Sequence, residues 1–201
     1  MRIKKIALVL FIGFALRLVV SCCDCPEEAV FKYTFDSIET RHLDNAGKTP
    51  AIVDSGTILK EAYGLQVEFS LIQLACNKTL NFSAFNSAYA TSCGCPPELQ
   101  YLAQDTISAI RIKTLNNFDQ THPADSDISG YFKVLDYDNY ITIQELIDAP
   151  EMIYYEKPDK DFMKVFLMQA PTQTGEYRFQ VELLLSNGTT LTSVTTPINL
   201  E

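Results

Sequence analysis

The sequence has 201 residues, of which 47% are hydrophobic and 11% aromatic, and its formal net charge is −9 at pH 7. This apolar content is enough to bury a core, which excludes a disordered tether. Residues 1–21 contain four of the 16 basic residues and no acidic one, so the rest of the chain carries a charge of −13. Such an acidic body repels phosphate groups, and we therefore expect no nucleic-acid partner.

The first 21 residues have the three parts of a secretory signal. A basic start with Arg2, Lys4 and Lys5 is followed by an apolar run, Ile6 to Leu16. A membrane-spanning helix needs about 20 apolar residues, and this run is far shorter. The pattern predicts a cleavable signal peptide over residues 1–21 rather than a permanent transmembrane helix.

The segment Leu18 to Cys22 reads LVVSC and resembles the lipobox of bacterial lipoproteins. The resemblance implies that Ser21 is the last residue removed and that Cys22 carries the lipid, with enough acyl chains for stable anchoring. Acidic residues follow in the expected tether, residues 22–28, and look like the surface-export signal of Bacteroidetes-type lipoproteins. We expect an outer-membrane lipoprotein on the cell surface. The alternatives are retention on the periplasmic face and an ordinary secretion signal beside a structural cysteine.

Five more cysteines follow the lipidation site, and an oxidising compartment favours disulfides. They are Cys23, Cys25, Cys76, Cys93 and Cys95. The count is odd, so at least one thiol is left over. Cys93 and Cys95 are too close for an easy mutual bridge, and we expect one to pair with Cys76 and the other with Cys25 or Cys23. Zinc held by these thiolates is the alternative.

Apolar and polar residues alternate with a period of two in several segments, which is typical of half-buried β-strands. The segments are residues 31–36, 65–71, 105–115, 131–135, 162–168 and 177–185, with a polar, β-branched run over 191–196. The pattern predicts a single antiparallel β-sandwich domain over residues 29–201.

The carboxyl end gives the most detailed prediction. Asn187-Gly188 lies between two strand-like runs and predicts a hairpin with a type I′ turn. Gly175-Glu176-Tyr177 resembles the entry to the penultimate strand of immunoglobulin-like sandwiches, which implies that the tyrosine hydroxyl bonds back to the preceding corner. The chain has no tryptophan, so the antibody branch of that fold is not indicated. The fold class expected is mainly β, an immunoglobulin-like antiparallel sandwich with one or two short helices.

Two segments interrupt the strand pattern. Residues 142–149 predict a short helix, because Thr142 at the N-cap and Glu145 three residues later form a capping box. Residues 77–104 are expected to be an irregular insertion, with a helical turn at 98–104.

Few residues suggest a chemical site. A polar loop, residues 116–130, contains three weak candidates for calcium ligands, Asp119, Asp125 and Asp127. The simpler interpretation is a solvated acidic loop. Asp36-Ser37-Ile38 and Asp105-Thr106-Ile107 match the O-glycosylation pattern of the same bacterial group, which makes Ser37 and Thr106 candidates. The only histidines, His42 and His122, lie in no catalytic motif. We therefore name no catalytic residue and no cofactor.

The whole pattern resembles outer-membrane lipoproteins of unknown-function families in Bacteroidetes. We expect a non-catalytic, lipid-anchored module that binds a glycan, a peptide or an outer-membrane protein. It should expose apolar or aromatic side chains on one sheet face or on its loops. One alternative is an envelope hydrolase on a β scaffold, with convergent titratable groups in a pocket. Another is a metal or thiol protein that uses its cysteines.

Overall fold

A computed structural model describes residues 29–76, 99–136, 139–149 and 161–201. The chain divides into two compact units, residues 1–30 with 77–100 and residues 31–76 with 101–201. Nearly all of the first unit lies outside the described residues, whereas most of the second lies within them. Among the described residues, no helix is long and apolar enough to cross a membrane.

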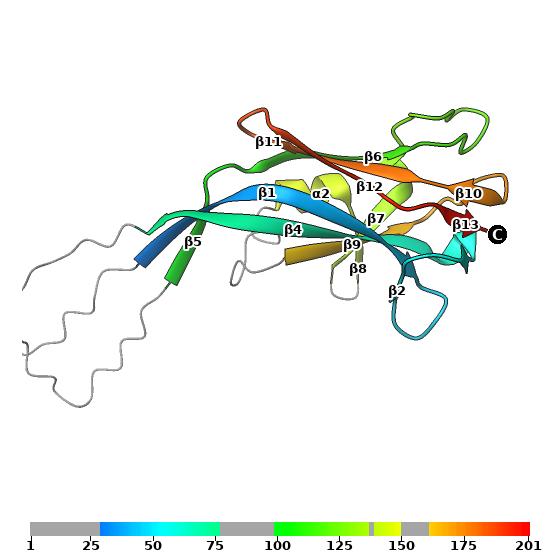
Figure 1. The fold of residues 1–201 in the computed structure, drawn as a ribbon, viewed down its shortest axis with the longest axis horizontal. Helices are drawn as coiled ribbons and strands as arrows, with labels where there is room; N and C mark the ends of the chain where they lie inside the picture. Colours follow the sequence, from blue (N-terminus) through cyan, green and yellow to red (C-terminus); the bar gives the residue numbers. More distant parts are fainter. Residues whose placement is uncertain (1–28, 77–98, 137–138, 150–160) are drawn as a thin grey trace, which may run out of the picture. The chain divides into compact units, whose positions relative to one another are not determined.

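The largest sheet has seven strands within the described residues, and its main path runs β2-β1-β4-β9-β7-β8, with β5 paired to β1 (Figure 1). We call it the large sheet. Its strands are β1 (Ala29–Asp44), β2 (Ala51–Val53), β4 (Tyr63–Cys76), β5 (Leu99–Ala103), β7 (Phe132–Asp136), β8 (Asn139–Thr142) and β9 (Asp161–Leu167). The two longest strands, β1 and β4, pair antiparallel along most of their length, and β4 pairs antiparallel with β9 on its other side.

Two three-stranded sheets complete the described part of the fold. The first, which we call the small sheet, has the order β12-β11-β6, and the second has the order β10-β13-β3. Their strands are β6 (Ile107–Thr114), β11 (Phe179–Leu185), β12 (Thr190–Val194), β3 (Thr57–Ile58), β10 (Gly175–Tyr177) and β13 (Ile198–Leu200). β13 pairs with β3 in parallel, whereas β1 with β2 and with β4, β4 with β9, β7 with β8 and with β9, β10 with β13, and β11 with β6 and with β12 are antiparallel.

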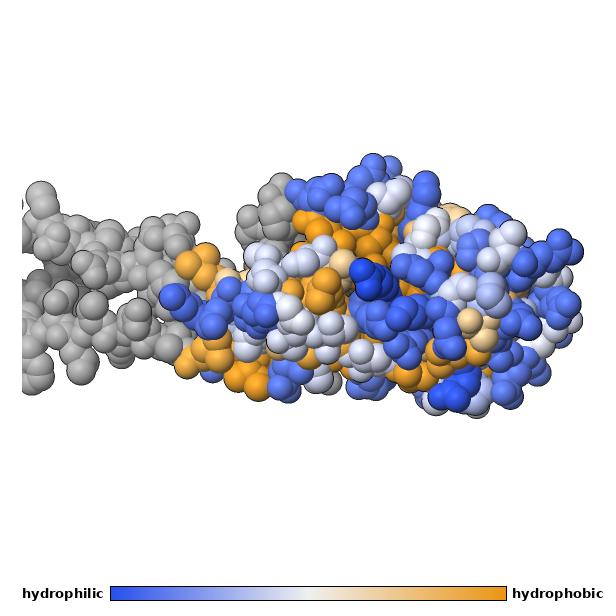
Figure 2. All heavy atoms as spheres, turned by 90° about the horizontal axis from the view of Figure 1, so that it is seen from above, coloured by the Kyte–Doolittle hydropathy of each residue, from blue (hydrophilic) through white to orange (hydrophobic). Residues whose placement is uncertain are grey.

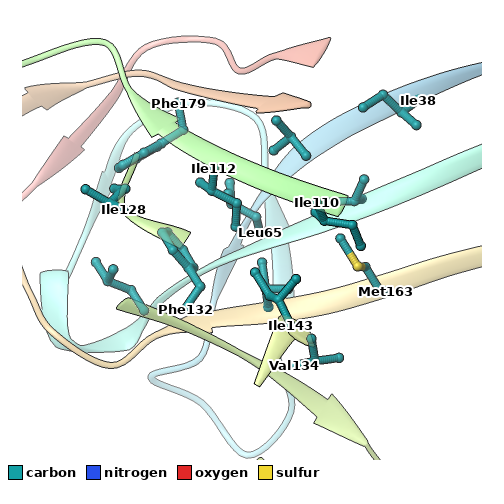
Figure 3. Packing of buried hydrophobic residues seen from close by; sticks show 14 of the residues in the cluster. Ile38, Leu65, Ile110, Ile112, Ile128, Phe132, Val134, Ile143, Met163 and Phe179 are labelled. Atoms are coloured by element: carbon teal, nitrogen blue, oxygen red, sulfur yellow. The ribbon is translucent and has the colours of Figure 1, made fainter. Parts of the chain in front are cut away.

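The core lies between the large sheet and the small sheet. Figure 3 shows Ile110 and Ile112 of β6 approaching Leu65 of β4 and Met163 of β9. All four belong to one cluster of buried apolar residues. Each strand contributes every second residue, because successive side chains of a strand point to opposite faces. The prediction of a mainly β, antiparallel sandwich is therefore confirmed.

The corner before β11 forms as expected. The hydroxyl of Tyr177 donates a hydrogen bond to the carbonyl of Gln173 at 2.9 Å. The ring is buried and stacks on Phe179, with 6.3 Å between centroids. This hydrogen bond is the one that the resemblance to immunoglobulin-like sandwiches implied.

The hairpin between β11 and β12 is confirmed, but the predicted type I′ turn was wrong. Gly188 has a φ of 86°, whereas Asp125 is the only described non-glycine residue with a positive φ, so Asn187 is not left-handed. The N–H of Gly188 donates to the carbonyl of Leu185 at 2.9 Å, and the N–H of Leu185 donates to the carbonyl of Thr189 at 2.8 Å. These bonds define a three-residue loop with a left-handed glycine at its end. In this loop the Asn187 side chain accepts the Thr189 N–H at 2.7 Å.

The short helix is confirmed as α2 (Ile143–Asp148), with Thr142 at the N-cap and a complete capping box to Glu145. The hydrogen bond from the Thr142 N–H, followed by that from its hydroxyl, lowers the pKa of Glu145. Two 3-10 turns, η1 (Lys60–Ala62) and η2 (Ser129–Tyr131), precede β4 and β7.

The expected helical turn at 98–104 was wrong, because Leu99–Ala103 forms β5 and pairs with β1. Pairing with a long neighbouring strand outweighs the weak local helix preference of this stretch. Residues 77–98 of the expected insertion lie outside the described residues.

Candidate functional site

The outer face of the large sheet carries exposed aromatic side chains. In β9, Met163, Val165 and Leu167 join the core, so Phe162 and Phe166 point away from it. Phe162 is 52% exposed and is aligned with Glu68 of β4. Tyr140 of β8 is 43% exposed, and its neighbour Ile141 packs against the core, so Tyr140 also points outward. Exposed aromatic residues on an outer face add nothing to the core of a two-layer sandwich. This face is therefore a candidate contact surface.

Lysines accompany these rings. Lys164 lies between Phe162 and Phe166 on the same face of β9, and its Nζ is 5.7 Å from the centroid of the Phe162 ring. Lys133 of β7 is aligned with Phe166. Within the described part of the chain, neither lysine forms an ion pair. We call these five residues the aromatic–lysine patch: Lys133, Tyr140, Phe162, Lys164 and Phe166.

The ring of Phe166, at the centre of the patch, packs against a glycine of the neighbouring strand. Phe166 is only 3% exposed although it faces outward. The Tyr140 ring meets the Phe166 ring edge-on, with 5.8 Å between centroids and 89° between planes. On β4, Gly64 is aligned with Phe166, and a Cβ at residue 64 would lie 2.8 Å from both Cδ1 of Phe166 and the carbonyl oxygen of Val165. The absence of a side chain at Gly64 therefore lets the Phe166 ring lie over the strand.

Toward β1 the same face is polar and internally paired. Glu68 accepts a hydrogen bond from Nε2 of Gln66 at 2.9 Å and lies 3.8 Å from Nε of Arg41. Arg41 also contacts Glu39 at 3.1 Å, and this hydrogen bond is the main cause that raises the pKa of Arg41. The carboxylates next to the patch are thus engaged by their own neighbours.

The opposite face of the sandwich has a different character. Figure 2 views the molecule from the side of β6, β11 and β12, and hydrophilic residues cover most of this view, with separate hydrophobic areas. On this face Lys113 pairs with Glu182 at 2.6 Å, and Gln180 donates to the same carboxylate at 2.8 Å. The Lys113 hydrogen bond is the main cause that lowers the pKa of Glu182.

The loop 116–130 brings Asp119 and His122 together, with Nδ1 of His122 2.9 Å from Oδ1 of Asp119. The same carboxylate accepts hydrogen bonds from the N–H and hydroxyl of Thr121 and from the N–H of His122. Desolvation alone would raise the pKa of Asp119, but these hydrogen bonds outweigh it and hold the pKa well below its ordinary value.

This Asp–His pair is not arranged like a catalytic dyad with a nucleophile. The hydroxyls near the imidazole, of Thr121 and Tyr131, face Nδ1, the nitrogen that Asp119 already contacts. No described residue hydrogen-bonds to Nε2. The T-shaped contact between His122 and Tyr131, 5.0 Å between centroids, anchors the loop instead.

The three weak calcium candidates do not converge. Asp127 accepts hydrogen bonds from the N–H and hydroxyl of Ser129, and Asp125 is left-handed with a φ of 68°. Within the described residues, no group of three or more His, Cys, Asp or Glu side chains is placed to hold a metal ion.

His42 lies in the core of the sandwich. Its Nε2 is 2.9 Å from the carbonyl of Thr196, which can only accept, so Nε2 carries a proton. In the neutral ring, Nδ1 then accepts from the hydroxyl of Tyr63 at 2.8 Å. Burial lowers the pKa of His42 and raises the pKa of Tyr63 well above its ordinary value. This chain of bonds connects β1 and β4 to the segment after β12.

The glycosylation candidates are accessible. Ser37 is exposed at an irregularity in the pairing of β1 with β4, and Thr106 is exposed just before β6. Cys22, Cys23, Cys25, Cys93 and Cys95 lie outside the described residues, as does the side chain of Cys76. The signal peptide and the tether are likewise outside them.

The sequence pattern predicts the strand over 162–168 but not the patch. Both alternating rows of this strand contain apolar residues, Phe162 and Phe166 in one and Met163, Val165 and Leu167 in the other. Alternation alone therefore did not show which row faces solvent. The lysine at position 164 was the available signal, because a lysine seldom faces a core.

Comparisons with known proteins add a family match. A family model described as a domain of unknown function, DUF5034, matches residues 35–196. No curated protein matches the sequence. The C-terminal domain of the Streptococcus pyogenes antigen I/II-family protein AspA is 9% identical, with 82% of this chain and 46% of that chain covered and a TM-score of 0.28. The C-terminal domain of the Streptococcus agalactiae AgI/II polypeptide BspA is 10% identical, with 81% and 49% covered and a TM-score of 0.28. This chain thus spans about half the length of those two structures.

Proposed function

The chain belongs to the DUF5034 family, a domain of unknown function, and we propose that it is a non-catalytic binding module whose contact surface is the aromatic–lysine patch. The observation that supports this most is the exposure of Phe162 and Tyr140 beside Lys133 and Lys164 on an open sheet face. Aromatic side chains supply large, rigid contact area at low entropic cost, and lysines add polar contacts at its rim. The patch contains no nucleophile with an adjacent base.

We also propose that the module is held at the outer membrane by lipid on Cys22, with the patch facing the cell's surroundings or the periplasm. The support is the LVVSC motif after a basic and apolar leader. Replacing Cys22 with serine should abolish palmitate labelling and release the protein from the membrane fraction. A variant that still carries label and stays with the membranes would contradict the proposal.

Binding through the patch can be tested with the full-length protein purified from membranes in detergent. The wild type, a Tyr140→Ala/Phe162→Ala variant and a Val194→Ala variant are compared on a glycan array and in pull-downs from native membranes. Val194 is the matched control, because it is 42% exposed on the small sheet. Thermal unfolding shows beforehand whether each variant is folded.

We expect the double variant to lose most of the binding and the control to keep it, because two exposed aromatic contacts contribute most of such an interface. Binding that survives the double substitution would place the site elsewhere. If neither the glycan array nor the pull-downs show binding that the double variant loses, the proposed function is wrong.

A further inference from the structure

The patch also indicates what kind of ligand it fits, and the argument rests on the proposed function. Phe162, Lys164 and Phe166 lie at alternate positions of β9, so their Cα atoms are spaced by about 7 Å along one row. Lys133 of β7 and Tyr140 of β8 lie beside this row on the same face of the large sheet. The patch therefore presents two exposed rings, Phe162 and Tyr140, with Lys164 and Lys133 on the same face, whereas the Phe166 ring is covered.

The position of β9 argues against a peptide that adds a strand. β9 lies between β4 and β7 in the large sheet, where its residues 161–166 pair with β4 and its residues 165–167 pair with β7. The hydrogen-bonding groups of a strand's backbone lie in the plane of the sheet, so a ligand on the outer face meets side chains. Peptides that bind to sheets commonly add a strand to a free edge, where main-chain groups are unpaired. Recognition on this outer face therefore comes from side chains, which suits a ligand that presents ring faces and charged groups of its own.

The charges on the patch indicate the sign of the charge that its ligand carries. Lys133 and Lys164 have no ion-pair partner among the described residues, although the chain as a whole is strongly acidic. Glu68, which is aligned with Phe162 on the same face, is engaged by Gln66 and Arg41. Glu145 is close enough to Lys133 for its pKa to be lowered slightly by that charge, yet its carboxylate is committed to the capping box. Two cations therefore remain available beside the exposed rings.

We infer that the aromatic–lysine patch binds an acidic polysaccharide, a chain of sugar rings that carries carboxylates. The C–H faces of the sugars pack on Phe162 and Tyr140, and the ammonium groups of Lys133 and Lys164 bind the carboxylates. A nucleic acid fits less well, because its dense phosphates are repelled by the acidic body and meet only two cations here.

The test uses the full-length protein in detergent and three probes: an oligogalacturonate, the same oligosaccharide with its carboxylates methyl-esterified, and polyglutamate as the acidic peptide. Affinities are measured by titration calorimetry for the wild type and for Lys133→Gln/Lys164→Gln. Lys48→Gln/Arg111→Gln is the matched control, since it removes the same charge from exposed positions outside the patch. Tyr140→Ala/Phe162→Ala is included to report the role of the rings.

We expect the wild type to bind the acid about tenfold more tightly than the ester, as two partly exposed charge contacts together supply about 1.4 kcal/mol. The lysine variant should lose this preference and the control should keep it. Equal binding of acid and ester, with both lost in the ring variant, would overturn the acidic class but leave the proposed function standing. Tighter binding of polyglutamate than of oligogalacturonate would overturn the inference in favour of an acidic peptide. If neither oligosaccharide binds, the inference is wrong.

Discussion

The two outer faces of the sandwich use strands of the same construction in different ways. On the small sheet, two of the outward residues of β11, Gln180 and Glu182, belong to a polar network in which Glu182 is contacted by both Lys113 and Gln180. On the large sheet, the outward residues of β9 are Phe162, Lys164 and Phe166. The inward residues of both strands are apolar and buried. Core formation therefore explains why the inner residues of both strands are apolar. Interactions within the fold also explain the polar outer residues of β11, but they explain the outer residues of β9 less well.

The difference between the faces is largest at Phe166. This ring is almost fully covered on the outer side of its sheet, so Phe166→Ala should destabilise the fold by about 3 kcal/mol. Its counterpart on the small sheet, Leu184, is only half-buried, and Leu184→Ala should cost about 1 kcal/mol. Urea unfolding followed by far-UV circular dichroism measures both. Equal costs would mean that no covered aromatic layer exists on the large sheet.

The second test asks whether that layer depends on Gly64. Gly64→Ala should cost about 1–3 kcal/mol, because the new Cβ would meet the Val165 carbonyl at 2.8 Å and backbone cannot move aside easily. Gly130→Ala is the control, since a Cβ at residue 130 meets nothing within 4 Å. Its effect should be within about 1 kcal/mol of zero. A neutral Gly64→Ala variant would show that the Phe166 ring is not held against β4.

A smaller, pH-dependent effect should come from His42, which connects the large sheet to the segment after β12. Burial lowers its pKa in the folded state, so the unfolded chain binds the proton more readily. Stability from this group is complete above the unfolded pKa of about 6.5 and is lost as the pH falls below that value.

The melting temperature of the wild type should therefore decrease between pH 7.5 and 5.5, and that of His42→Gln should decrease less over the same range. The carboxylates with lowered pKa, Asp119 and Glu182, titrate below this range and do not confuse the comparison. If His42→Gln loses as much melting temperature as the wild type over this range, the assigned protonation state is wrong.

The sequence predicted well which residues of the strands face the core, and poorly which apolar residues lie on the outer faces. Leu65, Val67 and Phe69 were assigned to a buried row because the residues between them are polar, and the same holds for Phe179, Val181 and Leu183. The helix at 143–148 was predicted from its capping box, which is a local interaction. These features need only neighbouring residues and are therefore visible in the sequence.

Features that depend on distant segments were missed. The outward position of Phe162 follows from the pairing of β9 with β4 and β7, and the hydrogen bond from His42 to Thr196 joins residues 154 apart. The local pattern predicts a helical turn where β5 forms, because the partner strand β1 is remote in sequence. Such pairings are set by tertiary structure, and no local pattern records them.

The smallest effect separates lysines that serve the fold from those that do not. Lys113 pairs with Glu182 on the small sheet, so Lys113→Gln should cost about 0.2–1 kcal/mol, and a double-mutant cycle with Glu182→Gln should recover a coupling of that size. Lys164 has no such partner among the described residues, and Lys164→Gln should change stability by less than about 0.5 kcal/mol. If both lysines cost the same, Lys164 contributes to folding and its place in a binding patch loses support. If Lys164→Gln is neutral for stability but weakens ligand binding, the charge on this face is explained by recognition rather than by folding.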